Sequence, residues 1–167
     1  MMSRWVWALL LGVLGAAFYV GNVVATPPDG FVGSTVASGT FGELNSRVQS
    51  GIWQESIRTK GHSDLYVQSN VWQPGGTTGW HTHPGPSLII VTEGTITTYD
   101  GDDPHCTPHV YTAGTPNNTF VDPGGGNVHI IRNETNAEAK DIAVQLVPAG
   151  ATRRQDVPDP GNCKFPS

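Results

Sequence analysis

Residues 74–94 read PGGTTGWHTHPGPSLIIVTEG, and residues 123–133 read PGGGNVHIIRN. Successive side chains of an extended strand point to opposite faces, so His81 and His83 project from the same face. The second stretch supplies His129 at the start of an apolar run. Imidazoles that converge from two strands form a nitrogen site with open coordination positions, and such positions imply a ligand or substrate. We therefore predict that His81, His83 and His129 hold one metal ion.

The spacing in both stretches resembles the two motifs of the cupin superfamily. The first motif reads Gly, five residues, His, one residue, His, three or four residues, Glu, six residues, Gly, and the positions that match it are Gly75, His81, His83 and Gly94. Ser87 stands where the family usually carries its glutamate ligand. The second motif ends Pro, one residue, Gly, two residues, His, three residues, Asn. Its matching positions are Gly126, His129 and Asn133, while Pro123 lies one residue further out.

From about Gly39 to Cys163, the chain resembles small exported bacterial cupin-domain proteins. This resemblance implies an all-β jelly-roll barrel, a double-stranded β-helix, with the three histidines pointing inward near one mouth. It also implies one divalent transition metal as the cofactor, either iron, manganese, zinc, nickel or copper. Because one fold hosts many activities, the resemblance indicates the fold more firmly than the reaction.

Ser87 determines the charge expected of this site. A serine hydroxyl is neutral and a poor metal ligand, so its presence in place of a carboxylate raises the net charge of a divalent site from about plus one to about plus two. We expect Ser87 to line the barrel and to bond backbone or water, for example a metal-bound water, instead of the ion. Glu93 shares its face, but six residues of strand separate the two by roughly 20 Å. Asp100 and Asp122 could approach only through a detail of the fold, so the predicted ligands are the three histidines.

Length and composition favour one all-β domain. The chain has 167 residues, 21 glycines and 13 prolines, and the glycines and prolines punctuate short stretches rich in Val, Ile, Thr, Trp and Tyr. The formal net charge is −5, and the only adjacent basic pair outside the first residues is Arg153 and Arg154, which we expect to be solvated. A negative net charge without a larger basic cluster does not indicate binding to nucleic acid or to an anionic membrane surface. The expected partner is a small-molecule ligand or substrate, and a homodimer is compatible with the sequence.

The N-terminal segment indicates export. Arg4 precedes an uncharged run from Trp5 to Gly21, and residues 1–25 read as a signal peptide cleaved near Thr26. The alternative is an uncleaved anchor, since residues 5–25 are nearly long enough to cross a bilayer. Either reading places the protein outside the cytoplasm, secreted, periplasmic or in the cell envelope, with no membrane contact beyond this segment. Residues 26–39 read as a flexible arm and residues 40–167 as the barrel with its C-terminal tail.

Two cysteines, Cys106 and Cys163, suit that oxidising location, where a single pair has one intramolecular connectivity. We predict a disulfide that pins the tail to a loop beside the barrel. Two unrelated free thiols are the alternative.

Alternating apolar and polar residues, separated by residues typical of turns, predict a chain that consists mostly of strands. A Thr40 followed three residues later by Glu43 resembles a capping box and predicts one short helix over 41–49. The predicted strands cover 52–60, 65–73, 78–83, 87–92, 95–100, 110–113, 119–122, 128–132 and 140–147.

Three functions fit these residues. The first is a metal-dependent enzyme, dioxygenase-like if the ion is iron, that acts on a small chelating substrate. The second is a non-catalytic module of the cell envelope that binds a metal or a small molecule. The third is a metal-free, epimerase-like cupin that uses histidine for proton transfer. No separate base or nucleophile names a reaction, so whether the protein is an enzyme stays open.

Overall fold

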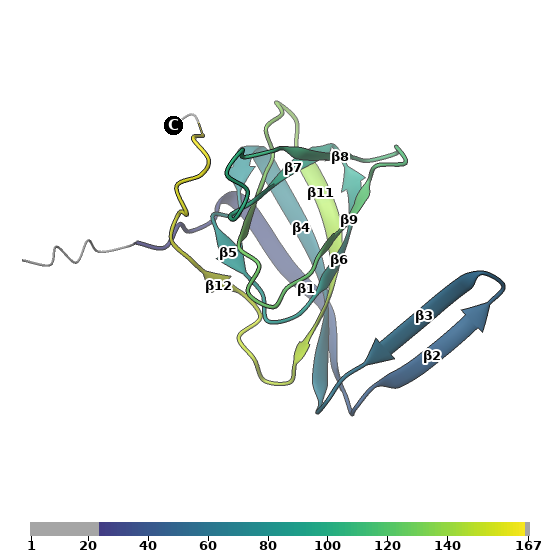
Figure 1. Ribbon diagram of the computed structural model, residues 1–167. Helices are drawn as coiled ribbons and strands as arrows, with labels where there is room; N and C mark the ends of the chain where they lie inside the picture. Colours follow the sequence, from purple (N-terminus) through teal and green to yellow (C-terminus); the bar gives the residue numbers. More distant parts are fainter. Residues whose placement is uncertain (1–23, 166–167) are drawn as a thin grey trace, which may run out of the picture.

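The computed structural model describes residues 24–165, and this part of the chain is built from strands (Figure 1). The strands are β1 (Asp29–Phe41), β2 (Asn45–Ser50), β3 (Trp53–Arg58), β4 (Ser63–Thr77), β5 (His81–Thr82), β6 (Ser87–Glu93), β7 (Thr95–Asp100), β8 (His109–Thr112), β9 (Thr119–Asp122), β10 (His129–Arg132), β11 (Ala139–Pro148) and β12 (Gln155–Asp156). No helix that could span a membrane is found among residues 24–165. The predicted signal peptide lies outside the described residues, apart from its last two positions.

Ten of the strands form one sheet that curls into a nearly closed barrel (Figure 1). Its order is β12-β5-β10-β4-β11-β6-β9, with β1 added to β4, β7 to β10 and β8 to β7, and the pairs are antiparallel. The prediction of an all-β, jelly-roll type of barrel is confirmed. The strands over 95–100 and 119–122 were predicted with their observed ends, and five of the other seven within two residues at each end.

Alternation along β6 and β11 determines which side chains enter the barrel. In β6, Ser87 and Ile89 are buried, whereas Leu88 and Ile90 are exposed. In β11, every second residue from Ala139 to Val147 is buried. The inward positions of β11 include the polar residues Asp141 and Gln145, so the barrel interior near these strands is polar and can hold a hydrophilic ligand.

Two apolar clusters stabilise the barrel besides this polar interior. One contains Trp72, Val91, Ile96, Ile131 and Ala139, and the other contains Trp80, Tyr99, Ile130 and Cys163. Trp72 and Trp80 are each only 1% exposed, so both belong to the core. The second cluster receives the C-terminal tail through the Cys106–Cys163 disulfide, whose Cα atoms are 5.2 Å apart. The predicted pairing is confirmed.

The side chain of Asn133, the last residue of the second motif, bonds two segments of backbone. Its Nδ2 donates to the carbonyl oxygens of Trp72, Gln73 and Ala137 at 3.2, 3.1 and 2.7 Å, and its Oδ1 accepts from the backbone N–H of Thr135 at 3.1 Å. Its side chain is fully buried, so these bonds satisfy groups that water cannot reach. The motif asparagine therefore holds the end of β10 against β4.

The predicted helix over 41–49 is wrong. Residues 45–50 form β2, which pairs with β3 in a separate two-stranded hairpin that projects from the barrel (Figure 1). The residues of the apparent capping box have partners distant in sequence. Thr40 Oγ1 donates to Asp64 Oδ1 at 2.6 Å, and Glu43 Oε1 accepts from the Gly61 N–H at 3.1 Å. Tertiary contacts thus replace the local bonds that would have begun a helix.

The flexible arm expected over residues 26–39 is also corrected. Most of it is the first part of β1, which pairs with β4 in register from Asp29 opposite Thr77 to Phe41 opposite Ser63. The backbone bonds of a strand do not depend on side-chain type, so a stretch rich in Gly, Ser and Thr can join a sheet without an apolar pattern.

Candidate metal centre

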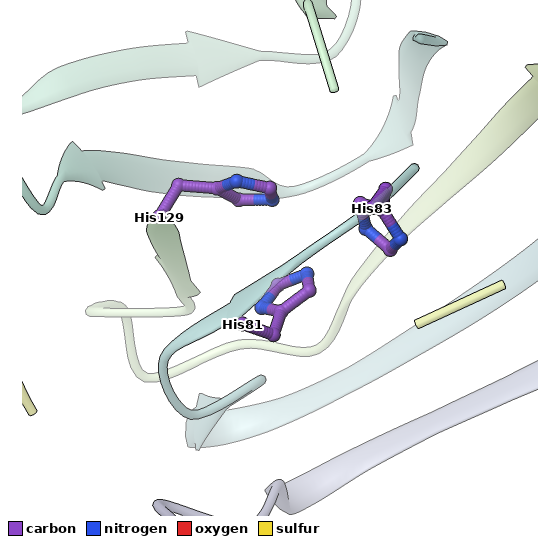
Figure 2. Close-up of side chains that lie close together, drawn as sticks. All are labelled: His81, His83 and His129. Carbon is purple, nitrogen blue, oxygen red and sulfur yellow. The ribbon is translucent and has the colours of Figure 1, made fainter. Parts of the chain in front are cut away.

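Two antiparallel strands bring the three predicted histidines together. His81 opens β5, His83 follows this strand directly, and His129 opens β10 opposite His81. The ring centroids are 4.3 Å apart for His81 and His129, 4.8 Å for His81 and His83, and 5.5 Å for His83 and His129. Each ring offers one nitrogen, and these nitrogens all lie within 4.8 Å of one another. Figure 2 shows the rings turned toward a common space from two segments of the chain.

The backbone orients each of these rings. The Nδ1 atoms of His81, His83 and His129 lie 3.0, 2.7 and 3.3 Å from the carbonyl oxygens of Gly79, Arg153 and Asn127. A carbonyl oxygen only accepts, so each Nδ1 carries the proton and donates it. Each Nε2 is then left with a free lone pair. A histidine that binds a metal usually has its second ring nitrogen held in this way, which fixes the tautomer.

Burial keeps the rings neutral. It lowers the pKa of His83 to about 4 and the pKa of His81 well below its usual range, where the neighbouring His129 lowers it further. Burial also lowers the pKa of His129, against the opposing effect of the Asp122 carboxylate. Neutral imidazole is the form that binds a metal, so at pH 7 the site needs no deprotonation before an ion enters.

The residues fit a divalent transition ion. Two metal–nitrogen bonds of about 2.1 Å separate their nitrogens by at most about 4.2 Å. The nitrogens of the three rings need to come only slightly closer to share one ion. Imidazole suits iron, nickel, copper and zinc, and three such ligands leave coordination positions open. That the trio binds a metal stays a prediction.

Asp122, which sequence reasoning left outside the site, lies beside it. Its Oδ2 is 3.8 Å from His83 Nε2, and its Oδ1 is 3.8 Å from His129 Nδ1. Asp122 ends β9 and faces Ser87 across the β6–β9 pair, where Ser87 Oγ donates to Asp122 Oδ2 at 3.4 Å. Sequence reasoning missed Asp122 because the spacing of residues along the chain does not indicate that β9 pairs with β6.

A cavity of about 220 Å³ opens at the histidines. Besides the histidines its polar lining includes Gln68, Asn70, Ser87, Asp122, Asp141, Gln145, Arg153 and Arg154. Arg153 and Arg154, expected to be solvated, are instead partly buried in its wall. Arg153 Nη1 donates to Gln145 Oε1 at 3.1 Å, and Arg154 Nη2 donates to the Thr78 carbonyl at 2.5 Å. Arg154 also forms an ion pair with Asp156, with 2.6 Å between Nη2 and Oδ1, so the cationic group that the wall adds beside the histidine trio is Arg153.

Asp141 is a buried carboxyl group in the same cavity. Burial raises its pKa to about 6, although hydrogen bonds donated by Asn70 Nδ2 at 2.8 Å and Trp72 Nε1 at 2.5 Å lower it. The folded protein thus holds the Asp141 proton more tightly than the unfolded chain does. The stabilising contribution is fully present below the unfolded value of 3.8 and is lost as the pH rises through about 6.

We expect Asp141→Asn to remove this pH dependence. The unfolding free energy of the variant minus that of the wild type should rise by about 3 kcal/mol between about pH 4 and pH 8, since two pKa units correspond to roughly that energy. Urea unfolding of both proteins across this range, with a chelator present, measures the difference. The histidine titrations are common to both proteins and cancel. A difference in unfolding free energy that stays constant with pH would contradict the raised pKa of Asp141.

No family model and no curated protein matches the chain. Among solved structures, the chain is similar to an oxalate oxidase in complex with the substrate analogue glycolate, at 25% identity over 48% of this chain and 41% of that chain, with a TM-score of 0.42. The match thus spans less than half the length of the oxalate oxidase.

Two further solved structures are a cupin-like protein from Thermotoga maritima and a cupin domain from Bordetella pertussis. The first is 21% identical over 57% of this chain and 65% of that chain, and the second is 18% identical over 74% and 97%, both with a TM-score of 0.45. Both of these solved structures are described as cupin proteins.

Proposed function

We propose that the protein is an extracytoplasmic metal-binding cupin in which His81, His83 and His129 hold one divalent transition ion and a small chelating molecule enters the cavity. The observation that carries the proposal is that all three rings are buried, neutral and oriented by backbone carbonyls with Nε2 free. All three rings line the cavity, so an ion that enters it can reach the Nε2 atoms. The Cys106–Cys163 disulfide is compatible with a location outside the cytoplasm.

The form of the cavity supports a small, anionic oxygen ligand. Its volume of about 220 Å³ is below the ~300–1,000 Å³ typical of sites for drug-sized ligands. Arg153 adds positive charge to its wall, and Gln145 holds the Arg153 guanidinium in place, whereas Arg154 is paired with Asp156. A carboxylate or another molecule with two adjacent oxygens would be attracted by this charge and could chelate at the open positions.

The residues of the cavity can each perform part of an enzymatic reaction. When bound, a divalent ion supplies Lewis acidity, or oxygen activation if it is iron. Arg153 binds and orients the anionic ligand, and the barrel walls formed by Ile89 and Ile131 exclude water from it. Asp141 lines the same cavity, where its two oxygens accept bonds from Asn70 and Trp72 and burial raises its pKa to about 6.

A non-catalytic binding module of the cell envelope is the second candidate. The observation in its favour is that Ser87 fills the position of the motif glutamate, so the arrangement of ligands differs from that of the family motif. In this case the same ion would be structural, and its removal would lower stability without abolishing any turnover.

One experiment separates the candidates. The purified protein is loaded with iron, manganese, zinc, nickel or copper, and its oxygen consumption and product formation are measured with diketones, phenols, thiols and small dicarboxylates. Turnover by the loaded wild type that is absent from His129→Ala supports the enzyme. Bound metal with a raised melting temperature and no turnover supports the binding module. A wild type that takes up no ion from any of these metals contradicts both.

A further inference from the structure

Resting on the proposed metal site, we infer that Asp122 supplies the carboxylate ligand that Ser87 cannot, so that the site has three imidazoles and one carboxylate. The carboxylate of the family motif has in this chain moved from β6 to the neighbouring strand β9. Asp122 belongs to neither histidine motif, and only the fold brings it to the site.

One oxygen of Asp122 lies close to the metal-facing nitrogen of His83, although Asp122 would have to move inward to share an ion with all three rings. Asp122 Oδ2 lies 3.8 Å from His83 Nε2, the nitrogen that is free to bind an ion. This separation is shorter than the limit of 4.8 Å within which the three histidine nitrogens lie from one another. Asp122 is also as buried as the histidines, at 5% exposure against 2–8% for the rings. Such a buried carboxylate needs a cationic or hydrogen-bonding partner, and an ion among these rings would be one.

The strand register explains how the exchange is possible. Ser87 and Asp122 are directly opposite in the antiparallel β6–β9 pair. Opposite residues point to the same face with Cβ atoms about 4.5–5.5 Å apart, so both side chains enter the barrel at the same height. A carboxylate attached at position 122 therefore reaches the same part of the cavity as one attached at position 87.

The loop after β9 holds the Asp122 carboxylate while leaving one oxygen available. Oδ1 accepts from the Gly124 N–H at 2.9 Å, whereas the one donor to Oδ2 among residues 24–165 is Ser87 Oγ at a long 3.4 Å. Gly124 has φ of +66°, and a Cβ there would lie 2.2 Å from the Gly85 carbonyl oxygen. The glycine thus lets the loop pass close enough for its N–H to fix Oδ1, and Oδ2 keeps a lone pair on the side of His83.

Other carboxylates near the motifs are used elsewhere. Glu93 is exposed and pairs with Lys140 Nζ at 2.8 Å, and Asp100 is paired with the exposed His109. Asp141 accepts bonds from Asn70 and Trp72. Among residues 24–165, Asp122 is the carboxylate that has an oxygen within 4.0 Å of a ring nitrogen of the trio. The site charge with a divalent ion is then plus one, not the plus two that Ser87 alone implied.

The test compares Asp122→Asn with Ser87→Ala and with the double variant Ser87→Glu/Asp122→Ser. Asparagine keeps the shape of aspartate and its bond from Gly124, so folding is checked by the melting temperature of the metal-free protein. Dissociation constants for Mn²⁺ and Zn²⁺ are measured by competition with an indicator chelator. Carboxylate suits manganese whereas imidazole suits zinc, so Asp122→Asn should weaken Mn²⁺ binding by about 100-fold and Zn²⁺ binding by only about 10-fold.

If Asp122 had only a structural role, Asp122→Asn would weaken the binding of Mn²⁺ and Zn²⁺ by the same factor. Ser87→Ala should change either constant by less than about threefold, because a hydroxyl contributes little to coordination. The double variant returns the carboxylate to the motif position and should recover most of the Mn²⁺ affinity. If Asp122→Asn binds both ions as the wild type does, or weakens both by one factor without rescue in the double variant, the inference is overturned while the histidine site stands. If the wild type binds neither ion, the proposed function itself fails.

Discussion

Replacing His129 by alanine is expected to weaken binding of a divalent ion by about 1,000-fold or more, since losing only an outer partner of a metal ligand already costs 10- to 100-fold. His129 is the sole ligand of the trio that comes from β10, so His81 and His83 would remain as two nitrogens on one short segment. Two imidazoles from one short segment hold an ion poorly against water, even with the Asp122 carboxylate that we infer as a further ligand. Competition with an indicator chelator at pH 7 gives the dissociation constants of both proteins.

His62→Ala is the matched control for this prediction. His62 is exposed and lies outside the cavity, so its replacement should leave the dissociation constant unchanged. Equal metal affinity of His129→Ala and the wild type would show that the ion, if any, binds elsewhere.

Removing the disulfide is expected to lower the free energy of unfolding by about 4 kcal/mol, because the chain-entropy model assigns that value to a loop of this length. The bond joins residues 57 apart in sequence and anchors the tail beneath Trp80 and Tyr99. The double variant Cys106→Ala/Cys163→Ala removes the bond without leaving a free thiol. Equilibrium unfolding in urea, followed by tryptophan fluorescence, measures the loss.

Reduction of the wild type by dithiothreitol provides an independent control, because it breaks the same bond without altering the sequence. Both treatments should give the same loss to within about 1 kcal/mol, the usual scale of one altered contact. A double variant as stable as the oxidised wild type would mean that the tail is held by packing against Trp80 and not by the bond.

Features that depend on local pattern could be predicted from the sequence. The alternation in residues 87–92 and 140–147 indicates strands with one buried face, and β6 and β11 have this form. The interval between His81 and His83 likewise places two rings on one face. These predictions succeed because the period of a strand is a property of the backbone itself.

Features that depend on long-range pairing could not be predicted in this way. Asp122 reaches the site only because β9 lies beside β6, and Arg153 and Arg154 reach it only because the segment after β11 returns across the cavity. The hairpin of β2 and β3 was read in part as a helix because Thr40 and Glu43 imitate a capping box, while their actual partners are Asp64 and Gly61. In each case the deciding contact joins residues far apart in the chain.

The most direct test of the histidine site is elemental analysis of the wild type and of a variant with alanine at His81, His83 and His129, after loading with metal and desalting. We expect about one divalent ion per wild-type chain and almost none in the variant, because its ligands are gone. A wild type that retains no ion, or a variant that retains as much as the wild type, would contradict the claim that these three imidazoles hold one metal.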